Sequence, residues 1–165
     1  MRVVSRIAIL AGIVVIATGI AAAETPAPHQ KPGLWETVMT MMGKPYTSQS
    51  CVTEESEAKM SVFGSQTRQK NCSSSAVSHN MDGSWSSVST CKFGSGAART
   101  THAKITGDLN SKFGIVISAE GSTPATNMTM TWAGPCKPGM RGGDVIMNGM
   151  KMNALDGTMS RGPPH

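Results

Sequence analysis

The chain has 165 residues and a net charge of +5, a size that predicts one domain once any export segment is removed. The charge comes without a dense run of lysine and arginine, so the composition argues against a nucleic-acid partner. Aromatic residues make up only 4% of the chain, which predicts a small core in which covalent cross-links matter more than usual.

The N-terminus has the pattern of a cleavable signal peptide. Arg2 and Arg6 precede an apolar stretch over residues 7–20, and a run of three alanines ends at Ala23. This order of charged, hydrophobic and small residues predicts cleavage before Glu24. The alternative is a retained membrane anchor, which needs about 20 apolar residues. Because cleavage removes 23 residues and two arginines, the mature chain has 142 residues and a charge of +3. We therefore expect an exported protein that meets the membrane only during export.

The sequence predicts four consecutive segments. A signal peptide over residues 1–23 is followed by an extended lead-in over 24–32, which contains three prolines. A disulfide-linked β domain is expected over 33–136. The Gly- and Met-rich segment 137–165 is predicted to be a flexible tail, in which residues 145–147 could add one short strand.

Most of the mature chain has the period of two that is typical of half-buried antiparallel strands. Phe113, Ile115 and Ile117 fall on one face of a predicted strand, and Met128 and Met130 on one face of the next. Strands are expected over residues 34–42, 46–52, 73–80, 84–93, 98–106, 112–120 and 127–132. The predicted fold is mostly β, an antiparallel meander of about seven strands that forms a curved sheet or a small open barrel.

One short helix is expected after the second strand. Thr53 is followed by Glu54 and Glu55. A threonine side chain can cap the first turn of a helix, and acidic residues there favour the positive end of the helix dipole. The predicted helix covers residues 54–63 and ends at Gly64.

The four cysteines form an even set in an exported chain, which predicts two disulfides. Residues 80–83 read Asn-Met-Asp-Gly, a pattern that suits a type I turn. A hairpin folded about the two central residues places Cys72 opposite Cys91. We therefore expect the disulfides Cys72–Cys91 and Cys51–Cys136. A metal site is disfavoured because the chain has no C-x-x-C pair and its four histidines are scattered.

No motif predicts catalysis or a cofactor. The sequence has no G-x-S-x-G elbow and no glycine pattern of a nucleotide-binding loop. We therefore expect a non-enzymatic protein without a cofactor, which binds either a small apolar ligand or an envelope protein. An unrecognised hydrolase is a further alternative, because a catalytic triad can be assembled from distant residues. If the curved sheet holds a ligand, Trp35, Trp85 and Trp132 could line the site; the alternative is that these tryptophans form the core.

Methionine offers a second binding chemistry. The chain contains several Met-x-Met pairs, among them Met128 with Met130 and Met150 with Met152. Thioether sulfur is a soft ligand that suits Cu(I), so these four residues are candidates for copper(I) binding. The competing interpretation is that methionine fills an irregular core in which leucine is scarce.

Three short motifs resemble one known family. Residues 31–36 read K-P-G-L-W-E, residues 51–54 read C-V-T-E ahead of the predicted helix, and residues 134–136 read G-P-C. With the order of the cysteines, these motifs resemble the bacterial periplasmic family catalogued as domain of unknown function three-six-one-seven. The resemblance covers about residues 31–136 and implies a small, mostly β protein of the periplasm. It implies no activity.

Overall fold

A computed structural model describes residues 27–41, 43–61, 72–92, 94–121 and 125–161. The predicted signal peptide lies outside the described residues. Among those that are described, no helix is long and apolar enough to cross a membrane.

The structure is mostly β, as predicted. The described residues form one short helix, α1 (Glu54–Met60), and ten strands, which are β1 (Gly33–Met41), β2 (Lys44–Val52), β3 (Cys72–His79), β4 (Trp85–Cys91), β5 (Arg99–Asp108), β6 (Lys112–Ala119), β7 (Thr126–Gly134), β8 (Asp144–Met147), β9 (Met150–Asn153) and β10 (Met159–Arg161). All ten strands belong to one sheet in the order β10-β9-β8-β2-β1-β7-β6-β5-β4-β3. Every pairing between neighbours is antiparallel.

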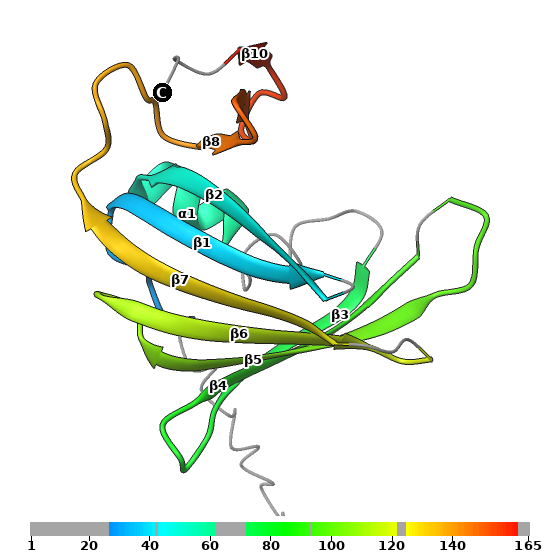
Figure 1. Cartoon of the computed structure of the whole chain (residues 1–165). Coiled ribbons are helices and arrows are strands. Elements are labelled where there is room, and N and C mark those ends of the chain that lie inside the picture. Colours follow the sequence, from blue (N-terminus) through cyan, green and yellow to red (C-terminus); the bar gives the residue numbers. More distant parts are fainter. Residues whose placement is uncertain (1–26, 42, 62–71, 93, 122–124, 162–165) are drawn as a thin grey trace, which may run out of the picture.

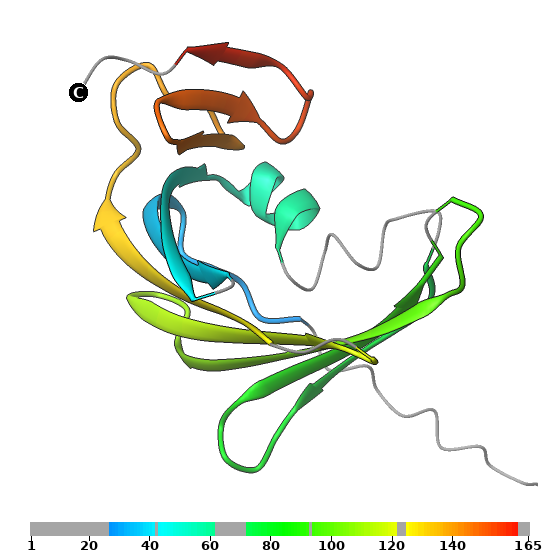
Figure 2. The same cartoon turned by 45° about the vertical axis from the view of Figure 1, so that its right-hand side comes forward.

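The sheet is an open curve with α1 on its inner side (Figures 1 and 2). After the β1–β2 hairpin and α1, the chain crosses to the far edge of the sheet and returns as a meander from β3 to β7. Strand β7 pairs with β1. The chain then continues past the β1–β2 hairpin, and β8 pairs with the edge of β2 that faces away from β1. The predicted meander is therefore correct for the β1–β2 hairpin and from β3 to β7, but β2 pairs with β8 and not with β3.

The prediction of about seven strands is too low, because three strands lie in the predicted tail. Strands β8, β9 and β10 occupy residues 144–161 and extend the sheet beyond β2. The sequence predicts at most one short strand in this segment, over residues 145–147, whereas the structure has three. The strands are short and carry buried polar residues, so the hydrophobic alternation that revealed β6 and β7 is weak in them.

Helix α1 begins where the sequence predicts. Thr53 is the N-cap, and its side chain accepts a hydrogen bond from Ser56 N at 3.3 Å. Ser56 Oγ accepts a bond from Thr53 N at 2.7 Å, which completes a reciprocal capping box. The helix ends at Met60, three residues before the predicted end, because Ser61 already has a non-helical backbone.

The hydrophobic core lies on the inner face of the sheet. Its buried members are Trp35, Val52, Ile105, Phe113 and Ile115. The rings of Trp35 and Phe113 meet edge to face with their centroids 5.2 Å apart. This cluster has five buried members among the described residues, a small core that agrees with the expectation from composition.

Both predicted disulfides are present. The predicted turn over residues 80–83 is closed by a hydrogen bond from Gly83 N to Asn80 O at 3.0 Å, but Asn80 N donates to Ser84 O, so the register of the strands beyond the turn differs from the prediction by one residue. A β-bulge between Cys72 and Ser74 shifts the register back. Cys72 therefore lies opposite Cys91, and the two sulfurs can bond.

Candidate functional site

The three tryptophans lie in or against the core. Trp35 is fully buried and donates from Nε1 to Lys31 O at 2.8 Å. Trp85 is partly buried and stacks on His79 at 4.5 Å between ring centroids. Trp132 packs against the core and donates to Pro32 O at 3.1 Å. The structure thus brings the three rings to one face of the sheet, where Trp35 has no surface free for a ligand.

Residues 31–33 of the K-P-G-L-W-E motif contact Trp132. Lys31 Nζ lies 3.6 Å from the centre of the Trp132 ring, a cation–π contact. A Cβ atom on Gly33 would lie 2.4 Å from both Trp132 Nε1 and Gly134 O. Because Gly33 also has a φ of +136°, only glycine fits at this position. The motif therefore serves the close pairing of β1 with β7.

The four candidate methionines do not lie together. Met128 and Met130 are partly buried on β7 and pack against the core. Met150 and Met152 are exposed on β9, and the sheet order places β1, β2 and β8 between β7 and β9.

A two-residue turn builds the β8–β9 hairpin. Met147 pairs with Met150, and the residues between them, Asn148 and Gly149, both have a positive φ, +52° and +72°. Asn-Gly in this geometry is the strongest short-range signal for a hairpin, and the sequence prediction did not use it. The hairpin is fastened to the domain by the Cys51–Cys136 disulfide and by a hydrogen bond from Gly143 N to Cys51 O at 2.9 Å.

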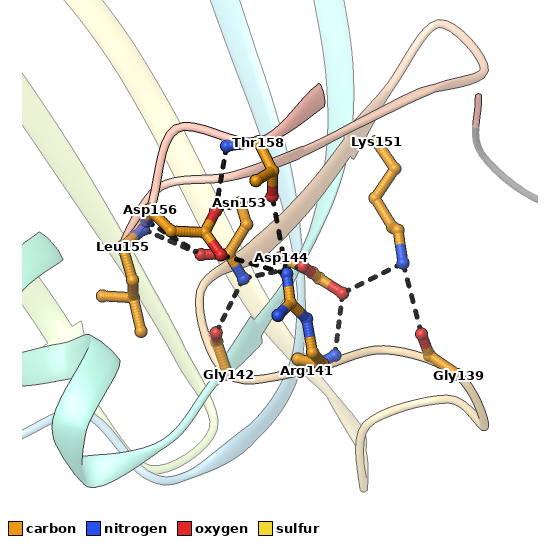
Figure 3. A network of polar contacts seen from close by, with 9 residues as sticks. All are labelled: Gly139, Arg141, Gly142, Asp144, Lys151, Asn153, Leu155, Asp156 and Thr158. Carbon is orange, nitrogen blue, oxygen red and sulfur yellow. Dashed lines mark hydrogen bonds and ion pairs between the residues drawn. The ribbon is translucent and has the colours of Figure 1, made fainter. Parts of the chain in front are cut away.

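A polar network around Asp144 holds the last three strands together (Figure 3). Asp144 is fully buried and accepts bonds from Arg141 N at 2.7 Å and from Asn153 Nδ2 at 2.8 Å. Lys151 Nζ lies 3.3 Å from the same carboxylate and donates to Gly139 O at 3.3 Å. The network thus fixes the Lys151 side chain between β9 and the loop after Cys136.

The network sets the ionisation of Asp144. Burial alone would raise the pKa of this carboxyl group, but the hydrogen bonds from Arg141, Asn153 and Lys151 outweigh it, and the pKa lies below its usual value. The ionised form therefore stabilises the folded state above the unfolded pKa of about 4. This contribution is lost as the pH falls through the lower, folded-state pKa.

We expect Asp144→Asn to lower the free energy of unfolding at pH 7 by roughly 1–3 kcal/mol, the cost of an unmet hydrogen bond to a buried group. The substitution should also weaken the dependence of the free energy of unfolding on acidic pH, which urea unfolding at pH 7 and pH 3 measures. Wild type should lose more stability between these two values than Asp144→Asn does. Equal losses in both proteins would contradict the role given to this carboxylate. Asp156→Asn, at an exposed carboxylate between β9 and β10, is the matched control and should have the smaller effect.

A row of side chains crosses five strands on the sheet face opposite Trp35. Cα pairing places side by side Glu36, Gln49, Ile146, Lys151 and Ser160. Gln49 Nε2 donates to Glu36 Oε1 at 2.9 Å, and Lys137 Nζ donates to Gln49 Oε1 at 2.7 Å. Ile146 is the apolar member of a row that is otherwise polar.

One end of this row lies in a groove of about 490 Å³, which we call the cationic groove. It is lined by Lys137, Pro138, Gly139, Met140, Ile146, Lys151, Ser160 and Arg161. Three cationic residues thus surround an apolar floor, and none of the described residues in the lining is a carboxylate. Asp144 forms an ion pair with Lys151 and offsets part of its positive charge. For Lys137 and Arg161, no acidic side chain among the described residues of the groove offsets the charge.

A second groove of about 430 Å³ adjoins the first through Ile146, which lines both. Its other lining residues are Glu36, Thr37, Val38, Thr47, Ser48, Gln49, Asn148 and Gly149. It lies where β8 stops pairing with β2, since only Ser48, Gln49 and Ser50 have partners on β8. Both volumes fall in the range of small-molecule sites. Among the described residues, no group of three or more His, Cys, Asp or Glu side chains could hold a metal ion.

The fold and the disulfides define a class of small, cross-linked proteins built on one open antiparallel sheet with one helix on its inner face. The family described as "Protein of unknown function (DUF3617)" matches residues 30–136, and the chain belongs to this family. No curated protein and no solved structure matches the chain. The lining of the cationic groove follows residue 136 and lies outside the matched range.

Proposed function

We propose that this protein is a non-enzymatic binding protein of the periplasm and that it holds a small anionic amphiphile in the cationic groove. The observation that carries the proposal is the joint lining by Lys137, Lys151 and Arg161 around Ile146 and Met140. Cationic side chains recognise a carboxylate or phosphate head, and the apolar floor receives the chain attached to it.

Two features of the chain support the location. The N-terminal residues have the pattern of an export signal. Both cysteine pairs are oxidised in the structure, and disulfides persist in compartments such as the periplasm.

The chemistry of the groove supports binding over turnover. Lys137 bonds Gln49, Lys151 bonds Asp144 and Gly139 O, and Ser160 is the one hydroxyl among the described residues of the lining. Among the described residues of the lining, no histidine or carboxylate could activate that hydroxyl. The groove therefore offers charge and apolar surface without an acid–base pair.

Calorimetric titration of the mature, oxidised chain with dodecanoate, kept below its micelle concentration, tests the proposal. We expect saturable binding of one dodecanoate per chain. Lys137→Gln/Arg161→Gln should weaken it by about tenfold or more, because a hydrogen bond to a charged group contributes about 1.5–3 kcal/mol. Lys151 is left intact in this variant because it also bonds buried Asp144.

Lys92→Gln/Lys112→Gln is the matched control, since it removes the same charge from exposed sites away from the groove. It should bind dodecanoate as wild type does. Equal weakening by the two double variants would show that only the overall charge attracts the ligand and would overturn the assignment of the groove, as would the lack of saturable binding by wild type.

A further inference from the structure

The last three strands expose four methionines on one face of the sheet. We call this set the methionine face: Met147, Met150, Met152 and Met159. Their exposed fractions are 44%, 53%, 42% and 64%. Large apolar side chains that stay this accessible on neighbouring strands are not explained by core packing, which accounts well for Met128 and Met130.

The strand register makes these four residues neighbours. Met147 is the cross-strand partner of Met150, and Met152 is the partner of Met159. Met150 and Met152 are two positions apart on β9, so their side chains leave the same face. The hairpin and the edge strand in which these residues lie are the short strands at the end of the sheet in Figure 2.

The spacing allows several sulfurs to reach one point. Cross-strand partners have Cβ atoms about 4.5–5.5 Å apart, and residues two positions apart on a strand are separated by about 7 Å. Methionine has three rotatable side-chain bonds, so thioethers at these distances can turn toward a common centre. Exposed side chains do this without displacing any core residue.

The other side chains of this face favour a soft ion. Its neighbours in register are Val145, opposite Met152, Ser48, opposite Met147, and Arg161, opposite Met150. None of them supplies the carboxylate or imidazole ligand that Zn²⁺ or Ca²⁺ requires, whereas thioether sulfur suits Cu(I). The positive charge of Arg161 opposes any bound cation, but this residue is exposed and also lines the cationic groove, so its guanidinium can lie away from the sulfurs.

We propose that the methionine face is a binding site for a soft monovalent metal ion, Cu(I), held by three or more of its thioether sulfurs. This site differs from the four methionines predicted from the sequence, because it replaces the core residues Met128 and Met130 by Met147 and Met159. None of its four methionines lines either groove, although Arg161, which lines the cationic groove, is the cross-strand partner of Met150. Binding of Cu(I) involves no change in oxidation state.

Anaerobic titration with Cu(I) against a chromophoric competitor tests the site. We expect the mature wild-type protein to bind one Cu(I) per chain and Met150→Leu/Met152→Leu to bind it at least about tenfold more weakly. Met128→Leu/Met130→Leu is the matched control and should bind as wild type does. Leucine keeps the apolar area of methionine but lacks its sulfur. Weaker Cu(I) binding by Met150→Leu/Met152→Leu therefore reports the loss of thioether ligands and not the loss of an apolar surface.

A second measurement needs no substitution. Ag(I) has the same charge and softness as Cu(I), and the methyl resonances of methionine report its contact with sulfur. In wild type, the resonances of the methionine face should shift on addition of Ag(I), and those of Met128 and Met130 should not. Equal, weak Cu(I) binding by wild type and Met150→Leu/Met152→Leu would overturn the proposal, and so would shifts confined to the core methionines.

Discussion

Replacing Cys51 and Cys136 by serine is expected to lower the free energy of unfolding by about 4.5 kcal/mol. The disulfide joins residues separated by 85 positions, and in the chain-entropy model a long closed loop restricts the unfolded state most. It also lies just before the segment that carries β8 to β10, so its loss should loosen the last three strands first. Urea unfolding of the mature chain measures the change.

The Cys72–Cys91 disulfide is the matched control. Its sequence separation is 19, so Cys72→Ser/Cys91→Ser should cost about 3.2 kcal/mol by the same model. The longer loop should therefore have the larger effect, and amide exchange in β8 to β10 should rise only in the Cys51/Cys136 variant. A larger loss of stability on removal of Cys72–Cys91 than on removal of Cys51–Cys136 would contradict the conclusion that Cys51–Cys136 is the more stabilising disulfide.

Trp35→Ala is expected to lower the free energy of unfolding by roughly 3–5 kcal/mol, the usual cost of deleting a large buried aromatic side chain. Trp35 is fully buried, meets Phe113 edge to face, and bonds Lys31 O. In a core with five buried members, this is a large share of the apolar area. Denaturant unfolding at pH 7 measures the loss.

Trp132→Ala is the control for that change, because its ring is only partly buried although it also bonds a backbone carbonyl. It should cost clearly less than Trp35→Ala. If both variants lost the same stability, the core would not be centred on Trp35.

The sequence predicts the sheet well where one face is apolar and the other polar. The alternation of Phe113, Ile115 and Ile117 predicts β6, and the structure pairs this strand as expected with β5 and β7. The helix start at Thr53 is likewise local, because the cap and its partner Ser56 are three residues apart. Such elements are encoded by neighbours in the chain.

The last three strands escape this kind of prediction because tertiary polar contacts hold them. Asp144 and Asn153 are buried at positions where a strand pattern requires apolar residues, and their partners come from different loops. The Asn148-Gly149 turn was the one local signal for this hairpin. Because β8 was expected only as a possible short strand, the sequence could not bring Lys137, Lys151 and Arg161 into one groove.

The most direct test of binding in the cationic groove compares two amphiphiles that differ in the sign of their head group. The mature, oxidised chain is titrated with dodecanoate and with dodecyltrimethylammonium at the same ionic strength. We predict saturable binding of dodecanoate that weakens as salt is raised, and no saturable binding of the cationic amphiphile. Equal affinity for both would contradict a groove that recognises its ligand by charge.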